Sequence, residues 1–253
     1  MELLIAQEIG SAAFAPGEYV EQQSFIRATE IRELAGRAAI GPPASVLDLC
    51  CGVAGPGRFI TRELGCDYLG IDASAAAIEI ASARAGDLPC RFQVGRVPPL
   101  PPGRFDVVLL LETMLAFRGK APLVAAVSAA LGPGGRFAFT LEEGAPLTPQ
   151  ERAAMPKADT VWLTPLDEMI ELLEAAGLRV TWQDDLSGAH GATAAALAAA
   201  YAANGPAIAA RVGPKGLEDL LTSHRLWADW LASGRARKLA LVAESGSDPE
   251  RRA

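Results

Sequence analysis

The chain alternates short apolar runs with segments whose apolar residues recur at helical spacing. The run 105–111 is apolar at every position except Asp106, as expected of a strand covered on both faces. The pattern predicts strands over 46–50, 68–71, 90–94, 105–111, 136–142, 178–182 and 238–243. It predicts helices over 21–40, 56–64, 74–84, 121–131 and 164–177, and two more within 190–233. This alternation indicates an α/β fold built on a parallel sheet with right-handed crossovers.

Three segments interrupt the alternation. The first 43 residues contain one amphipathic pattern, which stops at Gly41-Pro42-Pro43, and the proline-containing stretch 144–163 is expected to be irregular. Residues 185–233 hold two helical patterns that break near Gly213-Pro214. We therefore expect an N-terminal helical lid region (1–43), a main domain (44–244) with insertions at 144–163 and 185–233 that roof a pocket, and a disordered polar tail (245–253).

A turn of small residues follows the first predicted strand. Asp48 lies near the end of this strand, and the turn runs from Cys50 to Gly57 with the sequence CCGVAGPG. A helical pattern begins at about Pro56. The exposed N–H groups of such a turn and helix start can bind the polar end of a ligand. The sequence therefore predicts a ligand site at this turn.

Acidic residues stand at or near the ends of three predicted strands. These residues are Asp48, Asp72 and Glu112. In an open parallel sheet the ligand lies beyond the carboxyl ends of the strands, where the strand order reverses. Asp72 also follows Gly52 at the distance at which an acid hydrogen-bonds a ribose hydroxyl pair. If the three strands are neighbours, their acids line one rim of the sheet.

Composition narrows the class of protein and its partners. Half of the 253 residues are apolar and the formal net charge is −7, without a cluster of Lys and Arg. A nucleic-acid substrate is therefore disfavoured. The N-terminus lacks the basic region of a signal peptide, and no run of about 18 apolar residues indicates a membrane span. We expect a cytoplasmic protein with four reduced cysteines, whose spacing is not that of a metal site.

The motifs between residues 44 and 184 resemble those of the class I S-adenosylmethionine (SAM)-dependent methyltransferases. The stretch from Val46 to Pro56, VLDLCCGVAGP, is similar to the first motif of members that methylate small molecules. Ile71-Asp72 resembles the second motif, and LGPGGR at 131–136 resembles the turn before the fifth strand. The resemblance implies a Rossmann-like sheet of seven strands, mostly parallel with an antiparallel last strand and helices on both faces. It also implies SAM as the cofactor and a small molecule as the methyl acceptor.

The resemblance also assigns roles to residues around the turn. It implies that Asp48 orients the turn and helps to bind the methionine ammonium group. The backbone of Cys50 and Gly52 is expected to pass close to the methionyl part of SAM. Asp72 is expected to bind the ribose hydroxyls, with Ala73 against the adenine.

Four more residues complete the implied cofactor site. Glu112 is expected near the methionyl end of SAM, and Tyr19 belongs to the N-terminal lid over the cofactor. Arg96 and Val97 follow the third strand and are expected near the adenine amine. Together they place the cofactor along the carboxyl edge of the sheet.

Two features depart from the family pattern. The family usually has glycine where this chain has Cys50 and Ala54, so the turn carries larger side chains. An Asp commonly follows the glycine after strand three, whereas this chain has Arg96. The adenine amine then relies on backbone carbonyls or water, and we expect binding to be weaker by roughly 1 kcal/mol, the scale of one hydrogen bond.

Methyl transfer from a sulfonium requires mainly an aligned nucleophile and a site without water. A general base is required only where the acceptor must lose a proton. His190, in a segment after strand six that is expected to be flexible, is one candidate for this base, and Glu142 at the end of strand five is another. His224 lies in a helical pattern among apolar residues and is expected to pack.

Two other functions are compatible with the sequence. Cys50-x-Gly52-x-x-Gly55 is a degenerate form of the dinucleotide-binding glycine motif, which favours an NAD(P)-dependent oxidoreductase. Its first glycine is missing, and Asp48 is unusual in that position. The second alternative keeps the fold and SAM but catalyses a cyclisation or rearrangement without methyl transfer, since fold alone does not determine chemistry.

Overall fold

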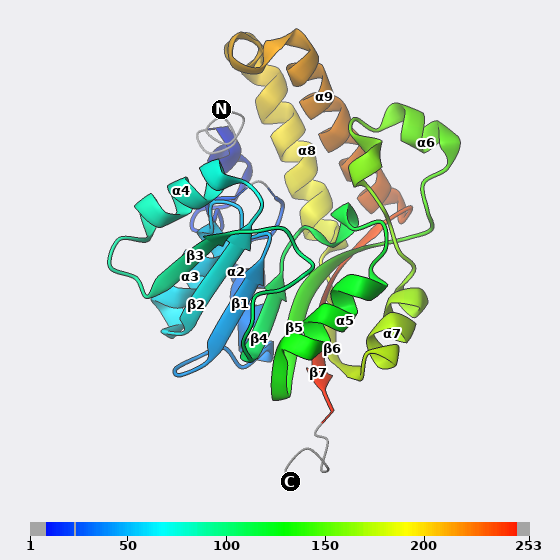
Figure 1. Cartoon of the computed structure of the whole chain (residues 1–253). Coiled ribbons are helices and arrows are strands. Elements are labelled where there is room, and N and C mark those ends of the chain that lie inside the picture. Colours follow the sequence, from blue (N-terminus) through cyan, green and yellow to red (C-terminus); the bar gives the residue numbers. More distant parts are fainter. Residues whose placement is uncertain (1–8, 23, 247–253) are drawn as a thin grey trace.

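A seven-stranded sheet in the order β3-β2-β1-β4-β5-β7-β6 forms the centre of the protein (Figure 1). The computed structural model describes residues 9–22 and 24–246. Paired strands are parallel from β3 through to β5, and β7 is antiparallel to both of its neighbours. The strands are β1 (Ser45–Leu49), β2 (Asp67–Asp72), β3 (Cys90–Val94), β4 (Phe105–Leu110), β5 (Leu131–Glu143), β6 (Leu178–Asp185) and β7 (Arg237–Ser245). The predicted mixed sheet with an antiparallel last strand is confirmed.

The strand order reverses at β1, which pairs with β2 on one side and with β4 on the other. Asp48 lies opposite Gly70 of β2 and Leu109 of β4. The acids Asp48, Asp72 and Glu112 therefore come from three adjacent strands or from the residues that directly follow them. Their positions at the switch point agree with the prediction that they line one rim of the sheet.

Helices cover both faces of the sheet. They are α2 (Ala28–Arg37), α3 (Gly55–Leu64), α4 (Ala75–Ala85), α5 (Ala121–Ala130), α6 (Pro149–Ala154), α7 (Leu166–Ala175), α8 (Ser187–Ala203) and α9 (Gly205–Ser233), with short 3₁₀ turns η1 (Ser11–Ala13), η2 (Met114–Ala116) and η3 (Ala158–Thr160). Leu123 and Met169 belong to the core that α5 and α7 form with one face of the sheet. Ile31 and Ile60 belong to the core on the other face, under α2 and α3. Among the described residues, no helix has the length and apolar character that crossing a membrane requires.

Helices α8 and α9 stand as a pair at one end of the sheet, beside the N-terminal η1 (Figure 1). They carry the insertion 185–233 that was predicted to roof a pocket. The segment around His190 was predicted to be flexible, and this is wrong because it forms the first turn of α8. Helix α9 bends at Gly213, where φ is 81° and the next residue is a proline without a backbone N–H.

Two boundaries differ from the prediction. The stretch 144–163 contains α6 and η3 and is therefore not wholly irregular, since Thr148 and Glu151 cap α6 reciprocally. Ser245 ends β7 rather than beginning a disordered tail. Residues 1–8 of the predicted lid and 247–253 of the predicted tail lie outside the described residues.

Gly57 lets helix α3 approach β2 closely. A Cβ atom at this position would lie 2.1 Å from Cζ and Oη of Tyr68, a fully buried ring. The Tyr68 hydroxyl in turn donates a hydrogen bond of 2.5 Å to Asp48. Helix α3, which follows the turn after β1, is therefore packed against the ring of Tyr68, and the hydroxyl of this ring binds Asp48.

We expect Gly57→Ala to destabilise the fold by about 1–3 kcal/mol, the usual cost of overpacking a close-packed core. Urea-induced unfolding measures this loss. Gly36→Ala in α2 is the matched control, because a Cβ there has open space and alanine stabilises helices. Equal stability of the two variants would contradict the role assigned to Gly57.

Candidate active site

The turn after β1 holds three residues in the left-handed backbone region. The φ angles of Cys50, Gly52 and Ala54 are 57°, 55° and 55°. Glycine adopts this conformation at little cost, whereas Cys50 and Ala54 carry strain of the kind found at functional sites. This conformation is the physical reason why glycine suits both positions. The turn is closed by hydrogen bonds from Cys51 N to Ile71 O (3.0 Å) and from Ala54 N to Cys51 O (2.8 Å).

Asp72 braces this turn from the end of β2. Its Oδ2 accepts a hydrogen bond of 2.9 Å from the backbone N–H of Gly52, and its Oδ1 accepts one of 2.8 Å from Ser74. Each carboxylate oxygen has a further lone pair that can accept a ligand hydroxyl. The structure thus joins Asp72 to the ligand turn, and the binding of ribose stays a prediction.

Asp48 is a buried carboxyl group at the bottom of the turn. Only 3% of the residue is exposed, and Tyr68 donates its hydroxyl hydrogen to Oδ2. Burial raises the pKa of Asp48 to about 7, against the opposing effect of the hydrogen bond from Tyr68. A cationic group placed beside it would favour the ionised form. This environment suits the binding of an ammonium group.

Two cavities meet at the carboxyl edge of the sheet. The smaller, of about 190 Å³, lies at the turn and is lined by Asp48, Cys50 to Val53, Gly55 and Pro56, among others. The larger, of about 330 Å³, lies under α8 and α9 and has largely apolar walls. Gln22, Ser24 and Glu112 line both cavities. The two cavities are therefore neighbours that share these three residues.

Glu112 occupies the junction between the cavities. Its backbone is held at a φ of 60°, and its N–H donates a hydrogen bond of 2.6 Å to Thr140 Oγ1. Its side chain pairs with the Lys238 ammonium at 2.7 Å. Burial acts to raise the pKa of Glu112, but Lys238, His190 and the hydrogen bond from Thr140 together outweigh it and lower the pKa below the ordinary value. Glu112 is therefore an anion at the boundary between the two cavities.

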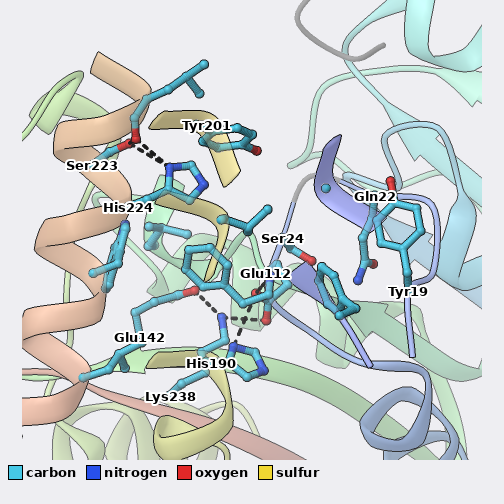
Figure 2. A pocket seen from close by; sticks show the side chains of 18 of the residues that line it. Tyr19, Gln22, Ser24, Glu112, Glu142, His190, Tyr201, Ser223, His224 and Lys238 are labelled. Carbon is cyan, nitrogen blue, oxygen red and sulfur yellow. Dashed lines mark hydrogen bonds and ion pairs between the residues drawn. The ribbon is translucent and has the colours of Figure 1, made fainter. Parts of the chain in front are cut away.

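Lys238 also binds Glu142, the second base candidate (Figure 2). Burial alone would lower the pKa of Lys238, but the two carboxylates raise it above its ordinary value. Glu142 Oε1 contacts the ammonium, whereas Glu142 Oε2 is buried without a hydrogen-bond partner among the described residues. Glu142 lines the larger cavity and, with Lys238 and Glu112, forms a buried ionic triad.

His190 lies fully buried against the same triad (Figure 2). Its Nε2 lies 3.1 Å from Glu30 Oε2, and its Nδ1 lies 3.9 Å from Glu112 Oε2. A carboxylate only accepts hydrogen bonds, so in the neutral ring Nε2 carries the proton and Nδ1 carries the lone pair. Nδ1 has no hydrogen-bond partner among the described residues, and His190 is one of the residues that line the larger cavity. The structure therefore presents a basic nitrogen to whatever occupies that cavity.

Glu30 orients His190 from helix α2. Arg27 holds its other oxygen with hydrogen bonds of 3.0 Å and 2.7 Å. Burial acts to raise the pKa of Glu30, but the hydrogen bonds from His190 and Arg27 outweigh it and lower the pKa. The sequence analysis missed this residue. Its signal was a carboxylate on the apolar face of the helix, four residues from both Ile26 and Leu34.

The remaining predicted cofactor residues lie around this edge but not all in the cavities. Tyr19 lines the larger cavity rather than the smaller one, and its ring packs against Phe14 at a centroid distance of 5.3 Å. Ala73 and Arg96 are exposed residues that follow β2 and β3, and Val97 packs on the edge of the core. None of these last three lines either cavity. Their adenine contacts stay predictions.

Residues 46–135 match a family model described as "Methyltransferase domain". The matched segment begins in β1 and ends within β5, so it contains the ligand turn and all three rim acids. It does not contain α8 or α9, which supply most of the roof of the larger cavity.

Curated relatives match part of this chain, and a solved structure has the same fold. The chain is 29% identical over 120 residues to a probable chloroplastic tocopherol O-methyltransferase of Oryza sativa subsp. japonica, covering 45% of this chain and 33% of the relative. It is 30% identical over 122 residues to phosphoethanolamine N-methyltransferase 3 of Arabidopsis thaliana, covering 47% and 25%. The matches thus span a third or less of these relatives. The crystal structure of the 4+2 cyclase SpnF superposes with a TM-score of 0.75 at 17% identity, covering 98% of this chain and 93% of that one.

Proposed function

Because the chain carries a class I SAM-dependent methyltransferase domain, we propose that it transfers a methyl group from SAM to a small molecule held in the larger cavity. The observation that carries this proposal is the junction at Glu112. A cavity at the cofactor turn and an apolar cavity with a buried histidine meet at this one carboxylate. Reactants placed in these neighbouring cavities lie on either side of this carboxylate, and an in-line displacement requires that the acceptor reach the methyl group past it.

The residues at the turn fit a bound SAM molecule. Asp48 presents a buried carboxyl group suited to the methionine ammonium, and Glu112 places negative charge near a sulfonium. Asp72, which already fixes the turn through Gly52, has lone pairs free for ribose hydroxyls. When bound there, SAM supplies an activated methyl group on a good leaving group. The protein is then left to align the acceptor and exclude water.

We assign the general base to His190 rather than to Glu142. His190 lines the larger cavity and its Nδ1 has no hydrogen-bond partner among the described residues, and Glu30 can stabilise the positive charge that the ring acquires with a proton. Glu142 is engaged by Lys238, so taking up a proton there would weaken a buried ion pair. A base is used when the acceptor is a hydroxyl group or another group that must lose a proton.

The N-terminal segment closes the site from one side. The backbone N–H of Phe25 approaches Glu112 Oε2 at 3.5 Å, and Gln22 and Ser24 line both cavities. Helices α8 and α9 close the other side. We propose that these segments form the lid and roof that exclude water from the reacting atoms.

Asp72→Ala is expected to weaken SAM binding by about 1.5–3 kcal/mol, because hydrogen bonds to a charged group are lost. Titration calorimetry measures the change. Asp67→Ala is the matched control, since Asp67 begins the same strand and makes an exposed ion pair with Arg91. Unchanged affinity of the Asp72 variant would refute the ribose assignment.

The activity is tested by incubating the protein with SAM labelled in its methyl group and a panel of small acceptors. We expect a labelled product together with an equal amount of S-adenosylhomocysteine (SAH). Calorimetry on the same preparation should show binding of SAM and SAH. Binding of NAD(P)H without binding of SAM would instead support the oxidoreductase and contradict the proposal.

A second candidate is catalysis without methyl transfer, which the likeness to a cyclase over nearly the whole chain favours. In that case the bound cofactor acts by its charge, and the acceptor cavity holds a molecule that cyclises or rearranges. Product analysis separates the two functions. Turnover of a substrate without formation of SAH would support the second candidate.

A further inference from the structure

The larger cavity contains a second histidine, His224, which the proposed chemistry does not use. The ring of Phe25 neighbours both imidazoles, with its centroid 6.2 Å from that of His190 and 5.7 Å from that of His224. Both contacts are edge-on. The two histidines therefore contact the same aromatic ring, and both line the same cavity (Figure 2).

The hydrogen bonds of His224 determine which nitrogen it offers to a ligand. Its Nδ1 lies 2.7 Å from the carbonyl oxygen of Leu220, one turn earlier in α9. A carbonyl only accepts hydrogen bonds, so Nδ1 carries the proton. Burial lowers the pKa of His224, against the effect of this hydrogen bond, and the ring is neutral at neutral pH. Its Nε2, at the far end of the side chain, then has a lone pair and acts as an acceptor.

Three acceptors without a donor belong to residues of this cavity, whose lining also includes hydroxyl groups such as those of Ser24 and Tyr201 that can donate. His190 Nδ1 and Glu142 Oε2 are buried without hydrogen-bond partners among the described residues, and His224 Nε2 is a third acceptor. Buried acceptors of this kind are costly unless a ligand or water donates to them. The ligand must bring hydrogen-bond donors. The walls between these groups include Leu115, Leu197, Trp227 and Leu231.

The charge at the base of the cavity disfavours anions. Glu112 and Glu142 share the single ammonium of Lys238, which leaves an excess of one negative charge in this triad. Lys157 also lines the cavity, but its side chain is exposed and its charge is screened by solvent. A carboxylate or phosphate in the interior would face two carboxylates and two lone-pair nitrogens.

We infer that the acceptor is an uncharged, largely apolar molecule with hydrogen-bond donors at two separated points, one bound by His190 and the other by His224. This inference rests on the proposed function and names the substrate class of the same site. His224 acts as a binding residue that selects and orients the acceptor. The donor at His190 is the group that loses its proton and receives the methyl group, and the other donor keeps its proton.

The test uses the protein saturated with SAH and three aromatic probes of similar size. The probes are 2,6-dihydroxynaphthalene, 2-naphthol and 6-hydroxy-2-naphthoate, and titration calorimetry measures their affinities. We expect the diol to bind about 3- to 10-fold more tightly than 2-naphthol, the effect of one additional hydrogen bond. The hydroxy acid should bind at least about tenfold more weakly than the diol, because its carboxylate meets the lone pair of His224 Nε2 in one orientation and Glu112 and Glu142 in the other, and donates to neither.

Variants of His224 show whether this residue makes the discrimination. His224→Leu should reduce the affinity for the diol to that for 2-naphthol and leave 2-naphthol unchanged. His224→Gln, which retains an acceptor of similar reach, should restore part of the preference. Arg225→Leu is the matched control, because Arg225 is the next residue of α9 and is exposed. It should leave all three affinities unchanged.

The outcomes separate this inference from the proposed function. Failure of the unsubstituted protein to bind SAH would overturn the methyltransferase assignment itself. If SAH binds, three results would overturn the inference about the acceptor and leave the methyltransferase assignment standing. They are tighter binding of the hydroxy acid than of the diol, an unchanged preference for the diol in His224→Leu, and failure of all three probes to bind. Thermal unfolding of each variant confirms that the fold is retained.

Discussion

Replacing His190 with glutamine is expected to lower turnover at saturating SAM and acceptor by about 10²- to 10⁴-fold, the usual contribution of a general base. Glutamine can still donate a hydrogen bond to Glu30, so α2 and α8 remain connected. It cannot accept a proton near neutral pH. The measurement is the rate of SAH formation with an acceptor found in the labelled-methyl screen.

The affinity for SAH is the control for this variant. His190 lines the larger cavity but not the smaller one, so calorimetry should give the same dissociation constant for the variant and the original protein. Glu142→Gln is the comparison at the other base candidate. Full turnover by His190→Gln, together with loss of turnover in Glu142→Gln, would transfer the role of base to Glu142.

Lys238→Met is expected to cause the largest loss of stability, about 3–5 kcal/mol, because it leaves two buried carboxylates without their cation. Only 3% of Lys238 is exposed, and its ammonium contacts both Glu112 and Glu142. Urea-induced unfolding at pH 7 measures the loss. Arg237→Met is the matched control, because Arg237 is the adjacent residue of β7 and forms an exposed ion pair with Glu143. This variant should lose no more than about 1 kcal/mol of the free energy of unfolding.

The loss in Lys238→Met should shrink as the pH falls. In the original protein the pKa of Glu112 is lowered by Lys238, so its contribution to stability is present above the unfolded-state pKa and is lost as the pH falls through the folded-state value. Without Lys238, burial alone raises the pKa of this carboxyl, and protonation on acidification then favours the folded state. A difference between the two proteins that stays constant from pH 7 to pH 5 would contradict this account.

The rim of the site could be predicted because its signals are local. Asp48, Cys50 and Gly52 lie within a few residues of the end of one strand, and a strand followed by a tight turn and a helix start has few possible arrangements. Asp72 and Glu112 stand at the ends of the neighbouring strands, so the sheet topology brings them to the same edge. The hydrophobic pattern predicts the strands, and the family resemblance implies the sheet in which they are arranged.

The orientation of His190 could not be predicted, because it depends on contacts between residues far apart in the sequence. Glu30 and His190 are 160 positions apart, and each lies in a helix whose packing follows from the completed sheet. The composition around His190, with two glycines, indicated flexibility. Packing of α8 against α9 and the hydrogen bond of His190 to Glu30 in α2 outweighed that local preference.

The larger cavity also required the structure. Its lining comes from η1, the loop before α2, the ends of β4 and β5, and helices α8 and α9. Each of these elements appeared in the sequence as an ordinary amphipathic or polar segment. His224 is an example. The sequence predicted that it packs, because its neighbours are Leu220, Leu221 and Trp227. The structure also places it among the residues that line the cavity.

A crystal structure of the protein with SAH tests the central claim most directly, because the claim concerns where two reactants lie. The account predicts SAH in the smaller cavity, with its ribose hydroxyls on Asp72, its ammonium group at Asp48 and its sulfur facing the larger cavity past Glu112. SAH bound elsewhere, or with its sulfur turned away from His190 and the larger cavity, would contradict the account.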